Sequence, residues 1–236
     1  MTFAQRPVSS AIQRRNGLAW LAAGMLAAGI AFSAGMAHAE STFVNGAGTA
    51  NARLNFQIVI PKFLYLQVGT GTYPTTVGTI DTLVYDMSSA IASIGNGTAQ
   101  NGTGGDLTAG AVTARVVGNN FTAASYSFSA TTTGALSNGA GNTISWSEIQ
   151  LAAGSPSAIV VAPLAASVLQ HPGTVAAPFA DGAATTVSLT PVSKVINQAA
   201  KWTFQYKNTN VSASGTYGVN GATLNGGQVT YAITMP

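Results

Sequence analysis

The residues of this chain that could do chemistry are few. Beyond residue 39 the only histidine is His171, which stands between Gln170 and Pro172. A Ser-His-Asp or Cys-His arrangement would use this histidine as its base. However, no serine lies in a Gly-x-Ser-x-Gly setting, and the chain has no cysteine. We interpret His171 as a loop histidine.

Carboxylates are equally scarce. A glycosidase needs two of them facing each other. Asp81 and Asp86 are separated by an odd offset, which would place them on opposite faces of a strand. Glu148 lies at a predicted bulge and is the best candidate for a catalytic acid, although a structural role is the simpler interpretation. A secreted hydrolase depends on Glu148 and His171 alone, so we predict no enzyme and no catalytic residue. The full set is Glu40, Asp81, Asp86, Asp106, Glu148 and Asp181.

Metal and cofactor sites have no recognisable motif. Zinc would need several histidine or cysteine ligands, which the chain lacks. The loop with Asn96, Asn101 and Asp106 offers oxygen ligands for calcium, but with one charge and no known spacing it is better interpreted as a solvated loop. The glycine-rich segments match neither a P-loop nor a dinucleotide fingerprint. We therefore predict no cofactor and no metal.

Several aromatic residues could form a sugar-binding platform or pack in a core. They alternate with polar residues along predicted strands, and this pattern favours the core. The residues are Trp146, Trp202, Phe204, Tyr206 and Tyr231.

The N-terminal stretch has the features of an export signal. Arg6, Arg14 and Arg15 precede an uncharged run, 17–37, rich in Ala, Leu and Gly, and Ala37-His38-Ala39 provides small residues for cleavage. This order predicts a cleavable signal peptide, residues 1–39. A membrane anchor is the alternative, because about 20 apolar residues can span a bilayer. We expect no membrane span in the mature protein, and a location from the periplasm to the cell surface or outside the cell.

Charge and composition exclude some functions. Removing 1–39 takes away three of the nine basic residues and none of the six acidic ones, so six of each remain and the net charge is zero. Because no cluster of Lys and Arg exists, we predict no nucleic-acid binding. Only 6% of the whole chain is charged, and a net charge near zero favours self-association. Without cysteine, the fold must depend on core packing.

Short stretches of alternating polarity, separated by Gly, Asn and Pro, predict strands. About nine or ten such strands with no helix after the signal indicate an all-β, antiparallel β-sandwich of Ig-like or jelly-roll character. We expect one domain, 40–236, or two small β domains split near 134–142. The predicted strands are 52–61, 63–68, 77–87, 111–117, 124–130, 143–151, 185–189, 201–207 and 228–235, with a hairpin-like connection at 118–120, a surface loop over 88–110 and a bulge near 147–148.

The first strand presents its apolar residues on one face. Leu54, Phe56, Ile58 and Ile60 alternate with mostly polar residues up to Pro61. This strand is either the first strand of the sandwich or a strand lent to a neighbouring molecule. We slightly favour pairing within the chain, with assembly through whatever edge remains.

Both ends of the chain resemble bacterial surface-fibre subunits. Ser214-Gly215-Thr216-Tyr217, followed by the alternating 228–234, is similar to the closing segment of chaperone–usher pilins, particularly the spore-coat-U-like branch. The Ala52–Ile60 strand is placed like a pilin donor strand. Family members complete an Ig-like fold by inserting one subunit's N-terminal strand into the next subunit. The disulfide common in that family cannot form here, and the chain ends in Met235-Pro236 rather than near a penultimate tyrosine.

This resemblance implies a function. We expect an exported, non-enzymatic structural or adhesive protein of a bacterial surface fibre, pilus or biofilm matrix that assembles by β-strand addition, with Leu54, Phe56, Ile58 and Ile60 as its assembly residues. Its expected partners are copies of itself or other fibre subunits, with a periplasmic chaperone. The alternative is a secreted carbohydrate- or calcium-dependent adhesin.

Overall fold

The computed structural model describes residues 41–153 and 155–235, and the chain divides into two compact units between Val59 and Ile60. The predicted signal peptide, 1–39, lies outside the described residues. In the first unit, residues 41–59 form no helix or strand and are exposed throughout. The Thr42 hydroxyl donates a hydrogen bond to the Asn51 carbonyl over 2.7 Å and closes a loop there.

The second unit is all-β, as predicted, with two short 3₁₀ turns as its only helical elements among the described residues. Its sheets are antiparallel apart from one short parallel pair. In chain order the elements are β1 (Leu64–Val68), η1 (Ile91–Ser93), β2 (Gln100–Asn101), β3 (Ala111–Asn119), β4 (Tyr126–Thr132), β5 (Leu136–Ser137), β6 (Thr143–Ile144), η2 (Trp146–Glu148), β7 (Ile149–Leu151), β8 (Ser167–Val168), β9 (Ala184–Leu189), β10 (Val195–Tyr206) and β11 (Val229–Ile233).

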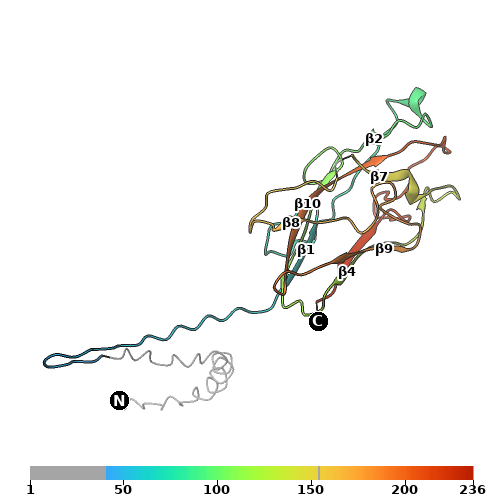
Figure 1. Cartoon of the computed structure of the whole chain (residues 1–236). Helices are drawn as coiled ribbons and strands as arrows, with labels where there is room; N and C mark the ends of the chain where they lie inside the picture. Colours follow the sequence, from blue (N-terminus) through green and yellow to red (C-terminus); the bar gives the residue numbers. More distant parts are fainter. Residues whose placement is uncertain (1–40, 154, 236) are drawn as a thin grey trace, which may run out of the picture. The chain divides into compact units, whose positions relative to one another are not determined.

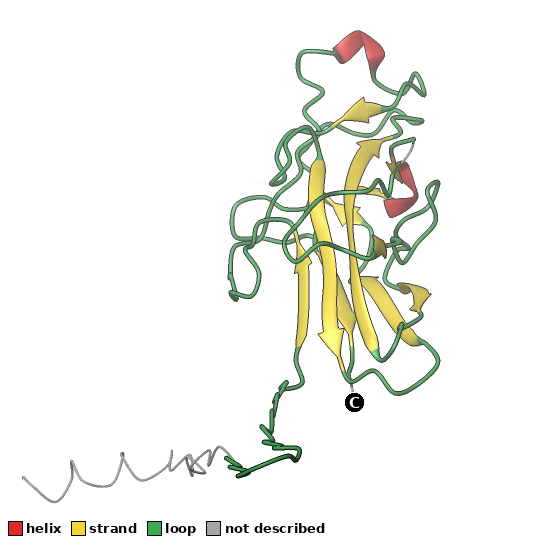
Figure 2. Cartoon of the chain, turned by 60° about the vertical axis from the view of Figure 1, so that its left-hand side comes forward, coloured by secondary structure: helices red, strands yellow, loops and turns green. Residues whose placement is uncertain are grey.

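Two main sheets form the sandwich (Figures 1 and 2). The larger one has the order β1-β3-β10, and the short strands β2, β7 and β8 also pair with β10. The smaller one has the order β11-β4-β9, while β5 and β6 form a separate hairpin. The twelve-residue β10 is the longest strand and links most of the larger sheet.

The strands run between two ends of the sandwich. At the near end β1, β4 and β10 begin, and β3, β9 and β11 stop. At the far end these roles are reversed, because each neighbouring pair among these six strands is antiparallel. The two sheets share these ends because the short connections 120–125 and 190–194 join β3 to β4 and β9 to β10.

Four local predictions were wrong. The predicted strand 52–61 is absent, because these residues belong to no strand. Residues 118–120 do not make a hairpin, because β3 and β4 belong to different sheets and their connection crosses the sandwich. The predicted strand 77–87 contributes only the bridge of Val84 to Thr103. Within 143–151 the phase change is a 3₁₀ turn, η2, between two short strands, and the Ser145 hydroxyl caps it by accepting from the Ser147 N–H over 3.1 Å.

The core lies between the two sheets and is richest along β3, β4 and β10. Trp202 of β10 is fully buried, stacks on Phe128 with ring centroids 6.2 Å apart, and donates its indole N–H to the Leu169 carbonyl over 3.2 Å. The predicted core placement of the aromatics is confirmed for Trp146, Trp202 and Phe204, which are all buried. These rings are therefore not a surface platform for sugars.

The outer face of β3 is covered as well, which explains why this strand is buried on both sides. Arg115 of β3 is 2% exposed. Its guanidinium donates to the carbonyls of Ala162 and Pro163, the latter over 2.6 Å, and lies 5.0 Å from the centre of the Tyr73 ring. Two proline-containing loops thus close over the larger sheet around one buried cation.

Trp202 offers a direct test of where the core lies. Replacing Trp202 by Ala should lower the free energy of unfolding by about 3–5 kcal/mol, because it leaves a cavity and removes the hydrogen bond to Leu169. The neighbouring Lys201 is exposed, so Lys201→Ala should change it by less than about 0.5 kcal/mol. Chemical denaturation measures both, and equal effects would contradict the proposed core.

Candidate functional site

His171 lies in a loop, as interpreted from the sequence, but its side chain is part of the core. It is 4% exposed and has edge contacts with the rings of Phe179, Trp202, Phe204 and Tyr231. The Gly173 N–H donates to Nδ1 over 2.9 Å, so Nε2 carries the proton of the neutral ring and donates to the Tyr231 hydroxyl at 3.0 Å. Both nitrogens are used within the fold.

Burial among aromatic rings lowers the pKa of His171 to about 4, and burial raises the pKa of its partner Tyr231. Both groups are therefore neutral near pH 7. A buried neutral pair with both ring nitrogens occupied stabilises the core and has no free atom for substrate.

Glu148 fixes the chain after β10. One carboxylate oxygen accepts from the Thr209 N–H over 3.0 Å, and the other accepts from the Thr209 hydroxyl and from the Asn210 amide, the latter over 3.3 Å. This is the structural role we favoured for Glu148. The oxygens of Glu148 bind Thr209 and Asn210, whereas the ring of His171 binds Gly173 and Tyr231, so the two residues do not share a partner among these hydrogen bonds.

The other described carboxylates also accept hydrogen bonds from main-chain N–H groups. Asp81 accepts from Thr70 at 2.5 Å, Asp106 from Thr113 at 2.8 Å and Asp181 from Trp146 at 2.7 Å. Asp86 accepts from Ser88 at 2.9 Å, and hydrogen bonds from Ser88 lower its pKa. These groups order turns. Among the described residues no group of three or more His, Cys, Asp or Glu side chains is arranged to hold a metal ion.

The amides of the loop that was weighed as a calcium site and interpreted as a solvated loop have partners of their own. Asn96 accepts from the Thr98 N–H and from Asn208, and Asn101 accepts from Gln205 over 2.9 Å. Asn208 is fully buried and accepts from the Gly95 N–H over 2.7 Å. The loop is thus held against the end of β10 by hydrogen bonds within the protein.

The feature that stands out is the free edge of β1. The Asn119 N–H donates to the Phe63 carbonyl and the Gly69 N–H to the Thr113 carbonyl. Bonded and non-bonded pairs alternate in an antiparallel ladder, so the N–H and C=O groups of Leu64, Leu66 and Val68 point away from β3. Among the described residues no strand pairs with this edge.

A second free edge belongs to β11. The Thr132 N–H donates to the Ala183 carbonyl on the β9 side of β4, so the residues of β11 opposite Thr132, Ala130 and Phe128 do not bond to β4. Those residues, Val229, Tyr231 and Ile233, direct their main-chain groups outward. No strand of the described part of the chain pairs there, and β1 and β11 approach each other across the sandwich.

The core is incompletely covered along these edges. Leu64, Leu66 and Val68 pack against it from β1, as do Val229, Tyr231 and Ile233 from β11, yet all six remain partly exposed. The inward residues of β3 and β10 are buried by comparison. We call the line between the free edges of β1 and β11 the seam. A hollow of about 310 Å³ also lies along β1, with Thr75, Thr76, Val77 and Thr79 on its other side.

The predicted assembly residues are exposed. Leu54 is 62% exposed, Phe56 86%, Ile58 85% and Ile60 74%. Residues 50–63 belong to no strand. The pairing within the chain that we slightly favoured is therefore absent from the described residues.

Comparisons with known proteins add no relative. No family model, no curated protein and no solved structure matches the chain. Over 41–153 and 155–235, no helix has the length and apolar character needed to cross a membrane.

The seam was not predicted from the sequence, because whether a strand edge is paired depends on which other strands lie next to it. The only sequence feature that could have indicated it is the composition of β1. Its nearly continuous apolar sequence, Phe63 to Val68, indicated either burial on both sides or a neighbour over its outer face. The outer face is in fact covered by Tyr73, whose ring contacts those of Phe63 and Tyr65 at 6.3 and 5.1 Å.

The pKa of His171 predicts how stability depends on pH. The unfolded chain protonates this residue near pH 6.5, whereas the folded chain does so near pH 4. The unfolded state therefore binds more protons between these values, and the free energy of unfolding should fall by about 3 kcal/mol as the pH drops from 6.5 to 4. His171→Gln, which does not titrate, should lose this part of the dependence. Urea unfolding at several pH values measures it, and identical pH dependence in both proteins would contradict the prediction.

Proposed function

We propose that this chain is an exported, non-enzymatic structural subunit of a bacterial cell-surface fibre or biofilm matrix, and that it assembles by β-strand addition. The segment Leu54–Ile60 of one copy would pair with the seam of another. One coincidence carries the proposal: the chain combines a core left partly exposed along two unpaired edges with an exposed segment of alternating apolar residues. Unpaired edges invite pairing with another chain.

The strand order supports an Ig-like assignment. In an Ig sandwich the first, second and fifth strands lie side by side, and the third and sixth pair in the other sheet. Counting only the long strands, β1-β3-β10 and β11-β4 correspond to these positions, whereas the fourth, β9, pairs with β4 instead of with the fifth. The seventh strand of an Ig domain lies beside the sixth, at the outer edge that β11 leaves unpaired. A strand added to the seam would take this place.

The free energy of strand addition depends on the apolar pattern of the added strand. Side chains on one face of a strand recur about every 6.6 Å, so four apolar residues could cover the half-exposed side chains of β1 and β11. Burying each stabilises the complex by about 1.5–3 kcal/mol, whereas ordering each residue of the segment costs about 1–2 kcal/mol. Over 54–60 the free energy gained by burying the four apolar side chains is similar in size to the entropic cost of ordering the seven residues. Main-chain hydrogen bonds to both edges then decide whether the complex is stable.

Export and partners follow from the same proposal. The signal-like N-terminus and the low charge suit a protein that leaves the cytoplasm and associates with copies of itself. A subunit with an open seam would need protection before assembly, which a periplasmic chaperone would give by occupying that seam.

Two neighbouring substitutions test strand addition. Phe56→Glu puts a charge on the apolar face of the segment and should block assembly of the full chain, because the carboxylate would be buried without a partner. Gln57→Glu adds the same charge on the opposite face and should assemble as the unchanged protein does. Both residues are exposed, so neither substitution should alter the stability of the sandwich. Analytical ultracentrifugation separates monomers from assemblies.

The proposal fails if the purified, unsubstituted chain remains a stable monomer at high concentration, with or without a chaperone. It also fails if Phe56→Glu and Gln57→Glu assemble equally well, because the apolar face would then have no role.

A further inference from the structure

The described carboxylates of the second unit all lie toward the far end of the sandwich. Asp81 binds Thr70, just beyond β1, and Asp106 binds Thr113 at the start of β3. Glu148 binds Thr209, just beyond β10. Asp86 follows the bridge of Val84 to Thr103, and Asp181 lies in the turn before β9. Lys201, which pairs with Thr113 in the register of β10 and β3, and Lys207, which follows β10, also lie toward this end. The far end therefore has five negative charges and two positive charges, a formal charge of −3.

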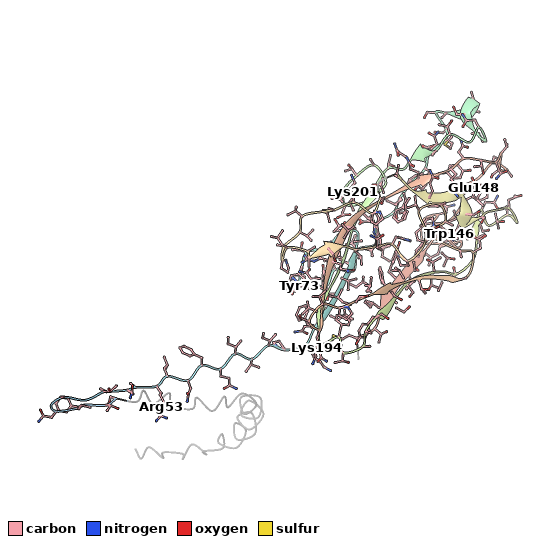
Figure 3. All side chains as sticks on the ribbon, in the orientation of Figure 1. Arg53, Tyr73, Trp146, Glu148, Lys194 and Lys201 are labelled. Atoms are coloured by element: carbon pink, nitrogen blue, oxygen red, sulfur yellow. The ribbon has the colours of Figure 1, made fainter. Side chains whose placement is uncertain are left out.

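The near end has the opposite sign. Lys62 precedes β1 by two residues and Lys194 immediately precedes β10, and both side chains are exposed. Asn119 brings them together, because it bonds to Phe63 and pairs with Val195. Neither lysine forms an ion pair with a carboxylate of the described residues. Figure 3 shows Lys194 at one end of the sandwich and Glu148 toward the other.

The backbone of the seam accepts a strand in either direction. β1 runs from the near end to the far end, and β11 runs back. An added strand is therefore parallel to one edge and antiparallel to the other whichever way it points. Hydrogen bonding alone gives little preference between the two directions.

The short linker between the donated segment and β1 determines which ends of the two copies meet for each direction of the added strand. Only Pro61, Lys62 and Phe63 separate Ile60 from β1, and three residues span at most about 10 Å. The near end of the donating copy must therefore lie close to the end of the accepting seam at which Ile60 of the donated segment is placed. If the donated segment is parallel to β1 of the accepting copy, Ile60 lies at the far end of the accepting copy. In the opposite direction, the two near ends meet.

We infer that the basic near end of one copy, Lys62 and Lys194, docks on the carboxylate-rich far end of the next copy and that this contact sets the direction of strand addition. The inference rests on the proposed function and adds an interface between sandwiches outside the seam. In the opposite direction four lysines would gather at one contact, and the two copies could exchange segments reciprocally as a closed dimer. When the near end of one copy docks on the far end of the next, each added copy still has a free end, so the assembly can grow as an open, head-to-tail filament.

This contact acts mainly on the encounter between copies. Exposed charges of opposite sign accelerate association and are screened by salt, with a Debye length of about 30 Å at 0.01 M and about 8 Å at 0.15 M. The rate of assembly should therefore fall with ionic strength. The uptake of an isolated peptide with the sequence of 52–60, which has no sandwich attached, should depend on salt much less.

The experiment uses full chains in defined roles. A fluorescent Phe56→Glu chain, which cannot donate its segment, serves as the acceptor, and donors with an intact segment are added to it. A donor with Lys62→Glu and Lys194→Glu should bind this acceptor roughly tenfold more slowly at low salt than the unsubstituted donor. Lys201→Glu changes an exposed lysine opposite Thr113, away from the near end, so it is the matched control and should have little effect. Adding Asp86→Lys to the acceptor should restore part of the rate for the reversed donor.

The peptide separates the two proposals. If the acceptor binds the 52–60 peptide and the lysine reversal slows only the full donor, the inference holds. Equal rates for the reversed, control and unsubstituted donors, with the peptide still bound, would overturn the inference and leave strand addition intact. Failure of the acceptor to bind either the peptide or the unsubstituted donor would instead overturn the proposed function, and this inference with it.

Discussion

Main-chain hydrogen-bonding groups along two strand edges constrain this molecule more than any side chain does. The N–H and C=O groups of Leu64, Leu66 and Val68 on β1, and those of the inward residues of β11, have no strand partner in the described part of the chain. The same residues leave the core partly exposed. The outer edge of β9 also lacks a strand partner among the described residues, but only the edges of β1 and β11 lie beside each other. An added strand there would improve both hydrogen bonding and packing.

The rest of the second unit makes this edge rigid. β10 pairs with β3 along nine residues and gathers β2, β7 and β8, while Trp202, Phe128 and their neighbours join the two sheets. Arg115 and Tyr73 hold loops over the outer face of the larger sheet. Carboxylates order the turns at the far end, and the same charges give the sandwich a negative end opposite its lysines. Structural capping and end-to-end polarity thus come from the same residues.

Particular residues show how far sequence reasoning reached. A nearly continuous apolar run placed β1, and short stretches bounded by turn residues placed β3, β4, β9 and β11. The core role of Trp202 and Phe204 followed from their alternation with polar residues. The strand prediction failed for 77–87, because a strand also needs a neighbour, and there only Val84 has one. His171 next to a proline looked like a loop residue, and its burial depends on the aromatic rings that four separate segments bring around it. The same holds for the candidate site. The apolar face of 54–60 could be predicted from the sequence, whereas the seam could not.

The sequence by itself determined the all-β character, the apolar face of Leu54, Phe56, Ile58 and Ile60, and the scarcity of catalytic groups, because these depend on residue type and on a period of two. Tertiary structure alone decided which strands are neighbours, that β3 and β4 lie in different sheets, and that β1 and β11 keep free edges. It also decided that the carboxylates lie together at the far end. These properties depend on contacts between residues that are distant in the chain, and a local pattern contains no information about which distant segment will supply the hydrogen bonds.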